Sequence, residues 1–226
     1  LVHKKRVYRL IEEIKKRGLH KKMSFSFQAR ADNTDPDLLQ ELYNCNFDSV
    51  FYGLESASNK VLEVIKKGET VEDCIDALRV TKNIGFHVSA AFIYALPTET
   101  HEDRMECLRF SKDIVIDLVR FNNATPYPGT ELYRIAKKEN RLNIVGLYEN
   151  FLSVATFIEN PFKKIALSYV PEGNRESEIK RDLLYSYFSF YLRPSQLIKT
   201  FDSRSQWFTV GESIYDLAWI KKIPAL

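Results

Sequence analysis

The stretch AAFIYALPTET, residues 90–100, is an apolar segment that ends abruptly in a proline turn and a carboxylate. A nearly continuous apolar run is typical of a strand that is covered on both faces, as in a parallel sheet. Pro97 then ends the strand pattern, and Glu99 and Thr100 follow at once. Polar groups just past the carboxyl end of such a strand occupy the place where parallel α/β folds bind their ligands.

Helical and strand patterns alternate on both sides of this stretch. Residues 4–17 have helical periodicity and end at Gly18. A second predicted helix begins at Pro36, after the capping residue Asp35. A third begins with a capping pattern at Thr70 and Asp73 and ends at Gly85. Strand patterns occupy residues 23–30, 47–56 and 86–96, and residues 117–132 give a further strand, a proline-glycine turn and a helix start. Strands separated by helices pair in parallel through right-handed crossovers, so we predict an α/β fold with a parallel, barrel-like sheet at residues 1–141.

The pattern changes at about Leu142. Residues 142–226 are aromatic-rich, contain one amphipathic helical segment that Pro194 breaks, and end in a tail with Trp207 and Trp219. We predict a mainly helical C-terminal annex that packs against the barrel. An interface with a partner domain or a membrane surface is the alternative for its aromatic residues.

Composition narrows the class of protein. The net charge is only +3 and the charges are interspersed, which argues against a dedicated nucleic-acid surface. No apolar stretch approaches twenty residues and the start lacks a secretory signal, so we expect a cytoplasmic protein without a transmembrane segment. Cys45, Cys74 and Cys107 are too far apart in sequence for a zinc or iron-sulfur ligand set, and we expect reduced structural thiols and no metal site.

Polar or turn-forming residues follow each predicted strand. They form the segments QAR (28–30), GLES (53–56), ALPTET (95–100) and NNATPYPGT (122–130). A carboxylate can accept both hydroxyls of a ribose, and an arginine can bind a ligand carboxylate through two donors. Taken singly, each segment could be a helix start, a surface ion pair or a turn. Four of them at the same end of consecutive parallel strands favour a ligand site.

The order of these motifs resembles the second half of a radical S-adenosylmethionine (SAM) enzyme core. The resemblance rests on QAR, DPDLLQEL, FYGLESAS, VLEVIKKGETVED, IGFHVSAAFIYALPTETHED and PYPGTELY. It implies strands 3 to 6 of that core, so that residues 1–141 would form a partial, incomplete parallel TIM-like barrel. The segment YSYFSFYLRP, residues 185–194, resembles the segment after the core in the subgroup that carries an amino-terminal cobalamin-binding domain.

The resemblance also implies roles for individual residues toward SAM. Glu55 and Ser56 would hold the ribose hydroxyls, and Arg30 and Gln28 would lie near the methionine portion. The adenine would meet the strand end formed by Phe92, Ile93, Ala95 and Glu99. The family usually has glycine where this chain has Ala95, and commonly where it has Thr98. No catalytic residue is predicted.

One family motif is absent from these 226 residues: the CxxxCxxC loop that holds the 4Fe-4S cluster. The resemblance implies that the cluster and cobalamin belong to an intact protein. Its N-terminal half, on the same or a separate polypeptide, would supply the cluster and the first strands. We therefore expect the C-terminal part of a radical SAM enzyme, a cobalamin-dependent methyltransferase or a related radical-modifying enzyme. The chain alone should be inert and bind SAM weakly. The substrate of the intact enzyme would be a small molecule or a peptide, between which the motifs do not distinguish. The alternative is a non-catalytic binding or regulatory module that has lost the cluster.

Overall fold

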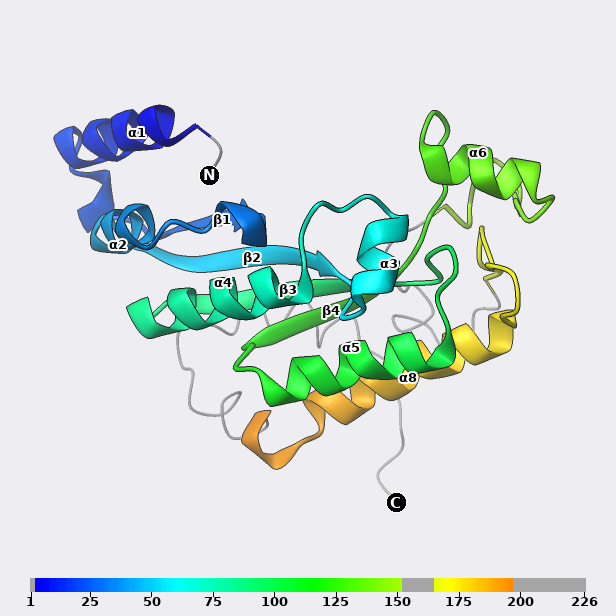
Figure 1. Cartoon of the computed structure of the whole chain (residues 1–226). Coiled ribbons are helices and arrows are strands. Elements are labelled where there is room, and N and C mark those ends of the chain that lie inside the picture. Colours follow the sequence, from blue (N-terminus) through cyan, green and yellow to red (C-terminus); the bar gives the residue numbers. More distant parts are fainter. Residues whose placement is uncertain (1–2, 152–164, 197–226) are drawn as a thin grey trace, which may run out of the picture. The chain divides into compact units, whose positions relative to one another are not determined.

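A computed structural model describes residues 3–151 and 165–196. Its sheet consists of β1 (Phe25–Ala29), β2 (Phe47–Glu55), β3 (His87–Tyr94) and β4 (Leu118–Asn123), in that spatial order (Figure 1). The pairings of β1 with β2 and of β2 with β3 are parallel. The strands follow one another in space as they do in sequence, and the predicted partial parallel barrel is confirmed.

Helices separate the strands along the chain. They are α1 (Lys4–Lys16), α2 (Pro36–Asn44), α3 (Asn59–Val64), α4 (Val71–Ile84), α5 (His101–Asp113), α6 (Glu131–Lys138) and α8 (Glu176–Tyr191), with 3-10 turns η1 (Leu19–Lys21) and η2 (Ala31–Asn33). The predicted caps are confirmed. The Asp35 carboxylate accepts a hydrogen bond from the Leu38 amide at 3.0 Å, and Thr70 and Asp73 form a reciprocal capping box. Gly85 ends α4 at φ +113°, where an added Cβ would meet the Tyr43 hydroxyl at 2.8 Å.

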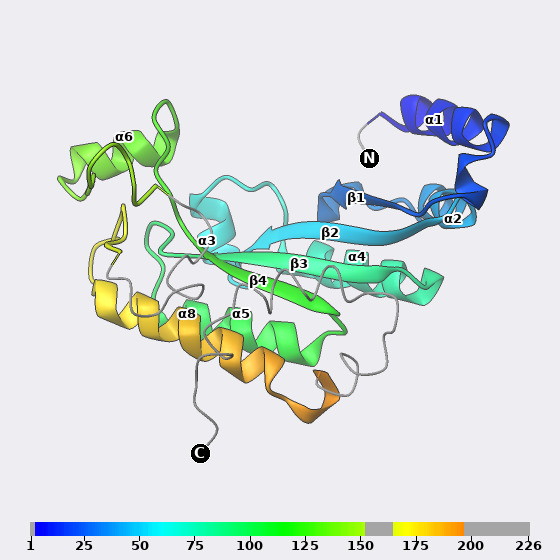
Figure 2. The ribbon, with the colours of Figure 1, turned by 180° about the vertical axis from the view of Figure 1, so that it is seen from behind.

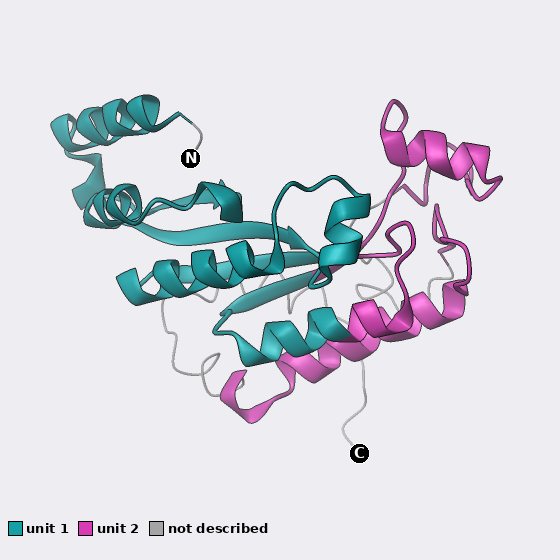
Figure 3. Cartoon of the chain, viewed as in Figure 1, with its two compact units in different colours: residues 1–92, 106–120 teal, residues 93–105, 121–226 magenta. Residues whose placement is uncertain are grey.

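The chain forms two compact units, which Figure 3 colours separately. Unit 1 comprises residues 1–92 and 106–120, and unit 2 comprises residues 93–105 and 121–226. Fully buried apolar residues fill each unit. In unit 1 they include Leu38, Leu39, Val50, Leu54, Val61, Leu78 and Val88, and in unit 2 they include Phe121, Ile179, Leu183 and Phe190.

Two details of the predicted organisation differ from the structure or lie outside its described part. Val115 continues the apolar spacing of Cys107, Leu108 and Ile114, which predicts an inward-facing helical side chain. It is exposed, because α5 ends at Asp113, two residues earlier. Trp207 and Trp219 lie outside the described residues. The domain boundary at residues 141 and 142 stays a prediction. Among the described residues, no helix combines the length and apolar character that a membrane span needs.

Candidate functional site at the strand ends

The carboxyl ends of β1 and β2 come together at one edge of the sheet in unit 1. The parallel register pairs Ala29, the last residue of β1, with Tyr52 of β2. Farther along β2, Glu55 pairs with Phe92 of β3 after a register shift between Gly53 and Glu55. Glu55 itself has φ +64°, a left-handed conformation that is uncommon for a residue other than glycine. The chain therefore turns sharply at the position that the sequence predicts to meet a ribose.

A group of five charged residues surrounds this edge. We call Arg30, Asp32, Glu55, Lys67 and Glu69 the strand-end cluster. The Lys67 ammonium donates a hydrogen bond to Glu55 Oε1 at 3.0 Å and lies 3.9 Å from Glu69 Oε2. The side chains of Lys67 and Glu55 are 14% and 20% exposed. Lys67 thus joins a partly accessible carboxylate to a fully buried one.

Arg30 completes the strand-end cluster from the end of β1. Its Nε and Nη2 donate to the two carboxylate oxygens of Asp32 at 3.1 and 2.9 Å, and Nη2 also donates to the Lys67 carbonyl at 2.8 Å. Arg30 Nε lies 3.1 Å from Glu69 Oε1. The guanidinium is therefore bound to protein groups on its Nε and Nη2 side. A ligand carboxylate would have to approach through Nη1 or displace Asp32.

Burial and charge shift the pKa values within the strand-end cluster in opposite directions. The hydrogen bonds from Arg30 lower the pKa of Asp32, and the Asp32 carboxylate raises the pKa of Arg30. Burial raises the pKa of Glu69, against the attraction of Lys67 and Arg30. Neither carboxylate oxygen of Glu69 has a hydrogen-bond partner, although both lie near cations. Glu69 is therefore a buried acid that depends on the two neighbouring cations.

Gly53 makes room for the Glu55 carboxylate. A Cβ added at Gly53 would meet Glu55 Oε1 at 2.6 Å and Lys67 Nζ at 3.6 Å. Carbon and oxygen atoms do not approach to 2.6 Å without displacement, so a side chain at this position would push the carboxylate away. The glycine of GLES is thus required by the folded-back position of Glu55.

The remaining predicted residues of unit 1 have different environments. Gln28 is exposed on β1, and Phe92 is fully buried with its ring 5.9 Å from that of Phe110 in an edge-to-face arrangement. Ser56 is buried, and its hydroxyl accepts a hydrogen bond from the Ser58 amide at 3.2 Å. Arg30 and Glu55 are therefore linked to each other through Lys67, whereas Phe92 and Ser56 face interior contacts.

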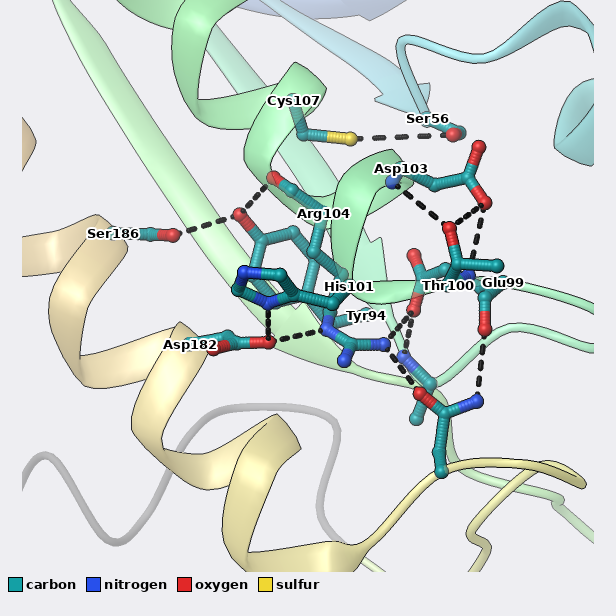
Figure 4. Close-up of polar contacts among 12 residues, drawn as sticks. Ser56, Tyr94, Glu99, Thr100, His101, Asp103, Arg104, Cys107, Asp182 and Ser186 are labelled. Carbon is teal, nitrogen blue, oxygen red and sulfur yellow. Dashed lines mark hydrogen bonds and ion pairs between the residues drawn. The ribbon is translucent and has the colours of Figure 1, made fainter.

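Glu99 and Ala95 belong to unit 2, where they form part of a second polar group. We call Glu99, His101, Arg104, Asn174 and Asp182 the α5–α8 network (Figure 4). Arg104 is fully buried; its Nε donates to Asp182 Oδ2 at 2.9 Å, and its Nη1 lies 2.9 Å from Asn174 Oδ1 and 3.4 Å from Glu99 Oε2. These contacts place the first turn of α5 beside α8, as both ribbon views show (Figure 2).

The Glu99 carboxylate stabilises the turn after β3 through a backbone hydrogen bond. Glu99 Oε2 accepts a hydrogen bond from the Ala95 amide at 2.6 Å, and the Asn174 side chain donates to the Glu99 carbonyl at 2.8 Å. Burial raises the pKa of Glu99 to about 8, because the lost hydration outweighs the favourable Arg104 guanidinium and Ala95 amide. Ala95 and Thr98 have φ +66° and φ +64°, so both positions at which the resemblance implies glycine adopt the left-handed conformation. Ile93 is half-buried in the last part of β3.

Tyr94 and the cysteines are core residues. The Tyr94 hydroxyl donates to the Arg104 carbonyl at 2.9 Å and lies 2.8 Å from Ser186 Oγ. Cys45, Cys74 and Cys107 are buried and form no disulfide, and burial raises the pKa of Cys74 to about 12. Within the part of the chain that the structure describes, no three His, Cys, Asp or Glu side chains converge as a metal site requires. These thiols do not fit a 4Fe-4S cluster, whereas the partly accessible Glu55 carboxylate fits the diol of a ribose.

Four residues that complete the strand-end cluster and, separately, the α5–α8 network had no signal in the sequence. Lys67 and Glu69 lie in the loop before α4, and Arg104 and Asp182 lie on helices 78 positions apart. The motif KKGET indicates a charged loop, but a sequence does not show that both charges turn inward. The partner of Arg104 is set by tertiary packing and has no local signal.

Comparison with known proteins identifies the family. Residues 1–111 match the model of the radical SAM superfamily. An "uncharacterized methyltransferase" of Pyrococcus horikoshii is 33% identical over 198 residues, which cover 88% of this chain and 40% of the relative. A putative methylthiotransferase of Methanocaldococcus jannaschii is 38% identical over 117 residues, or 50% of this chain and 26% of that protein.

Solved structures show the same fold. The radical SAM methyltransferase TsrM of Kitasatospora setae, solved with cobalamin and a [4Fe-4S] cluster bound, superposes with a TM-score of 0.57 at 16% identity; the match covers 79% of this chain and 40% of that one. Coproporphyrinogen III oxidase of Escherichia coli superposes with a TM-score of 0.56 at 17% identity, over 84% of this chain and 37% of that one. The chain belongs to the radical SAM superfamily, and it spans about 40% of the length of the Pyrococcus relative.

Proposed function

We propose that the chain is part of a radical SAM methyltransferase, or of a related radical-modifying enzyme, and that its strand ends hold the nucleoside half of SAM. The Pyrococcus and Methanocaldococcus relatives are described as a methyltransferase and a methylthiotransferase, which supports the class of reaction. In such enzymes SAM supplies the transferable methyl group or the one-electron chemistry. The residues of this chain bind and orient it.

The position of Glu55 carries the proposal. Glu55 is the last residue of β2, and its carboxylate is partly accessible, accepts a hydrogen bond from Lys67 at 3.0 Å, and lies in the space that Gly53 leaves. A carboxylate has acceptor sites for several hydrogen bonds, so the bond from Lys67 leaves capacity for both ribose hydroxyls. In unit 1, Ser56, Gln28, Arg30 and Phe92 remain proposed contacts or supports of the same ligand. The roles of Ile93, Ala95 and Glu99, which belong to unit 2, remain predictions.

The cluster and the cobalamin are assigned to other parts of the whole protein. The described cysteines are buried and separate, so they provide no ligand set for iron. The TsrM structure holds both groups, and by analogy of fold we extend them to the whole enzyme that contains this chain. The 226 residues alone would then catalyse no reaction. The proposed partners are an N-terminal part, on the same or a separate polypeptide, and a small-molecule or peptide substrate.

Affinity for the nucleoside should be low in the absence of iron coordination. Hydrogen bonds contribute about 1 kcal/mol net each, and association costs several kcal/mol. A dissociation constant on the order of 1 mM follows for adenosine. Ligand-observed NMR titration is suited to this range.

The test compares adenosine with 2′-deoxyadenosine on the wild-type chain, on Glu55→Gln and on Glu63→Gln. Hydrogen bonds to a charged acceptor are worth about 1.5–3 kcal/mol, so we expect Glu55→Gln to weaken adenosine binding about tenfold. Glu63 is an exposed carboxylate on α3 and serves as the matched control, for which no change is expected. Equal binding of the two nucleosides by the wild-type chain would contradict the proposed role of Glu55.

A further inference from the structure

We infer that Lys67 is a positioning residue that sets the orientation of the Glu55 carboxylate toward the ribose diol. The inference rests on the proposed function and adds to it a residue outside the GLES motif. Lys67 lies twelve positions after Glu55, in the loop between α3 and α4. It reaches back to the strand end through its side chain.

Both ends of Lys67 are fixed by the strand-end cluster. The backbone carbonyl accepts a hydrogen bond from Arg30 Nη2 at 2.8 Å, and the backbone amide donates to the Leu62 carbonyl at 3.0 Å. The ammonium lies between Glu55 Oε1 at 3.0 Å and Glu69 Oε2 at 3.9 Å. A lysine side chain ordinarily loses considerable rotamer entropy when it is held in place, and here the buried Glu69 carboxylate compensates for that loss.

Glu69 explains why a cation must be at this position. Its side chain is fully buried, its oxygens have no hydrogen-bond partner, and Arg30 and Lys67 supply the neighbouring positive charge. A buried carboxylate without a counter-charge is costly, so Glu69 holds the Lys67 ammonium near the sheet edge. From there the ammonium is within hydrogen-bond distance of Glu55.

The orientation of the Glu55 carboxylate in turn depends on Lys67, a residue outside β2. Its backbone is in the left-handed region, and its carboxylate folds back over Gly53 instead of extending from the strand end. Without Lys67 the carboxylate would gain rotamer freedom and hydration, and it would lose the single position in which it faces a bound diol. The expected consequence is a loss of discrimination between ribose and deoxyribose.

The experiment measures this discrimination directly. Adenosine and 2′-deoxyadenosine are titrated into the wild-type chain, Lys67→Met, Lys67→Arg and Lys66→Met, with ligand-observed NMR as the readout. We expect the wild-type chain to bind adenosine about tenfold more tightly than the deoxynucleoside, Lys67→Met to reduce this ratio to less than about twofold, and Lys67→Arg to restore it in part. Lys66 is exposed, and its replacement should leave the ratio unchanged.

The outcomes separate the inference from the proposed function. A wild-type preference for adenosine that Lys67→Met retains would overturn the role of Lys67 and leave the function of Glu55 intact. A wild-type chain with no preference would instead contradict the proposed function. A merely structural ion pair would change the free energy of unfolding without changing the ratio. If Lys67→Met fails to fold, Lys67→Leu removes the same donor and should likewise reduce the ratio to less than about twofold; a ratio that Lys67→Leu retains would overturn the role of Lys67.

A measurement without nucleoside tests the same contact. In the wild-type chain, the protons of the Lys67 ammonium should exchange slowly with water. The ¹⁵N chemical shift of this ammonium should change in Glu55→Gln. It should also change in Gly53→Ala, because the added Cβ displaces the Glu55 carboxylate. An ammonium signal that is insensitive to both substitutions would contradict the inference.

Discussion

Arg104 of α5 and Asp182 of α8 form a buried ion pair, with Nε 2.9 Å from Oδ2 and both side chains at most 3% exposed. Asp182 Oδ2 also lies 2.8 Å from Nδ1 of His101, one turn earlier on α5. The pair therefore joins the start of α5 to the middle of α8 within unit 2, and Glu99 connects both to the turn after β3 (Figure 4).

Replacing Arg104 should strongly destabilise unit 2. Arg104→Met leaves the Asp182 and Glu99 carboxylates buried without their guanidinium, and removal of one partner of a buried pair costs about 3–5 kcal/mol. Urea unfolding followed by circular dichroism measures the change. Arg109→Met is the matched control, because Arg109 pairs with Glu106 at the surface of the same helix and exposed pairs contribute at most about 1 kcal/mol. Similar costs for the two variants would contradict the described role of Arg104.

The raised pKa of Glu99 predicts a loss of stability as the pH rises. The carboxyl has a pKa of about 8 when folded and 4.5 as the ordinary value, so between these values the folded state binds more protons than the unfolded state. Its contribution is fully present below about pH 4.5 and disappears as the pH passes 8, with a total effect on the order of a few kcal/mol. Glu69 acts in the same direction, because burial raises its pKa as well.

Glu99→Gln should reduce this pH dependence. The amide oxygen can still accept the Ala95 hydrogen bond, but it has no charge to bury. The free energy of unfolding, measured by urea titration from pH 5 to 8, should fall less steeply in Glu99→Gln than in the wild-type chain. Glu102→Gln, which changes an exposed carboxylate of α5, should keep the wild-type slope. An unchanged slope in Glu99→Gln would show that this carboxylate is not the cause.

Ala95 should tolerate glycine better than a strand alanine does. At φ +66° an alanine is strained by about 1–2 kcal/mol, so Ala95→Gly removes this strain while it loses a buried methyl group. We expect a change in the free energy of unfolding of less than about 1 kcal/mol. Ala90→Gly, in the middle of β3 and equally buried, should cost about 1–2 kcal/mol more. Equal costs would contradict the strain at the turn.

The three cysteines should neither assemble a cluster nor react readily. All three are buried, and burial raises the pKa of Cys45 and Cys74, so the thiolate forms that bind iron are disfavoured. Anaerobic reconstitution with iron and sulfide should give no stoichiometric charge-transfer absorbance on this chain. A thiol reagent should label the native chain slowly and the urea-unfolded chain quickly. A stoichiometric cluster on the native chain would contradict the assignment of the cluster ligands to other residues.

The local features of the fold were accessible from the sequence because short-range chemistry determines them. Asp35 before Pro36, the Thr70–Asp73 capping box and Gly85 after α4 each satisfy backbone groups at a helix end, and the structure contains all three. The end of α5 was harder to predict. Val115 continues the apolar spacing of the helix, but the backbone leaves the helix after Asp113.

The candidate site was predictable only in part. Glu55 ends the strand pattern of residues 47–55, and the parallel register places it at the same sheet edge as the end of β1. Lys67, Glu69 and Asp182 had no such signal, because long-range packing determines which charges are buried together. The sequence also did not indicate that Arg30 is already bound by Asp32.

The most direct test of the central claim is the ratio of the dissociation constants for 2′-deoxyadenosine and adenosine, measured by NMR on the wild-type chain and on Glu55→Gln. If the strand end of β2 holds a ribose through Glu55, the ratio is about ten in the wild-type chain and about one in the variant. A ratio of one in both proteins, or a ratio that Glu55→Gln leaves unchanged, would contradict the nucleoside site.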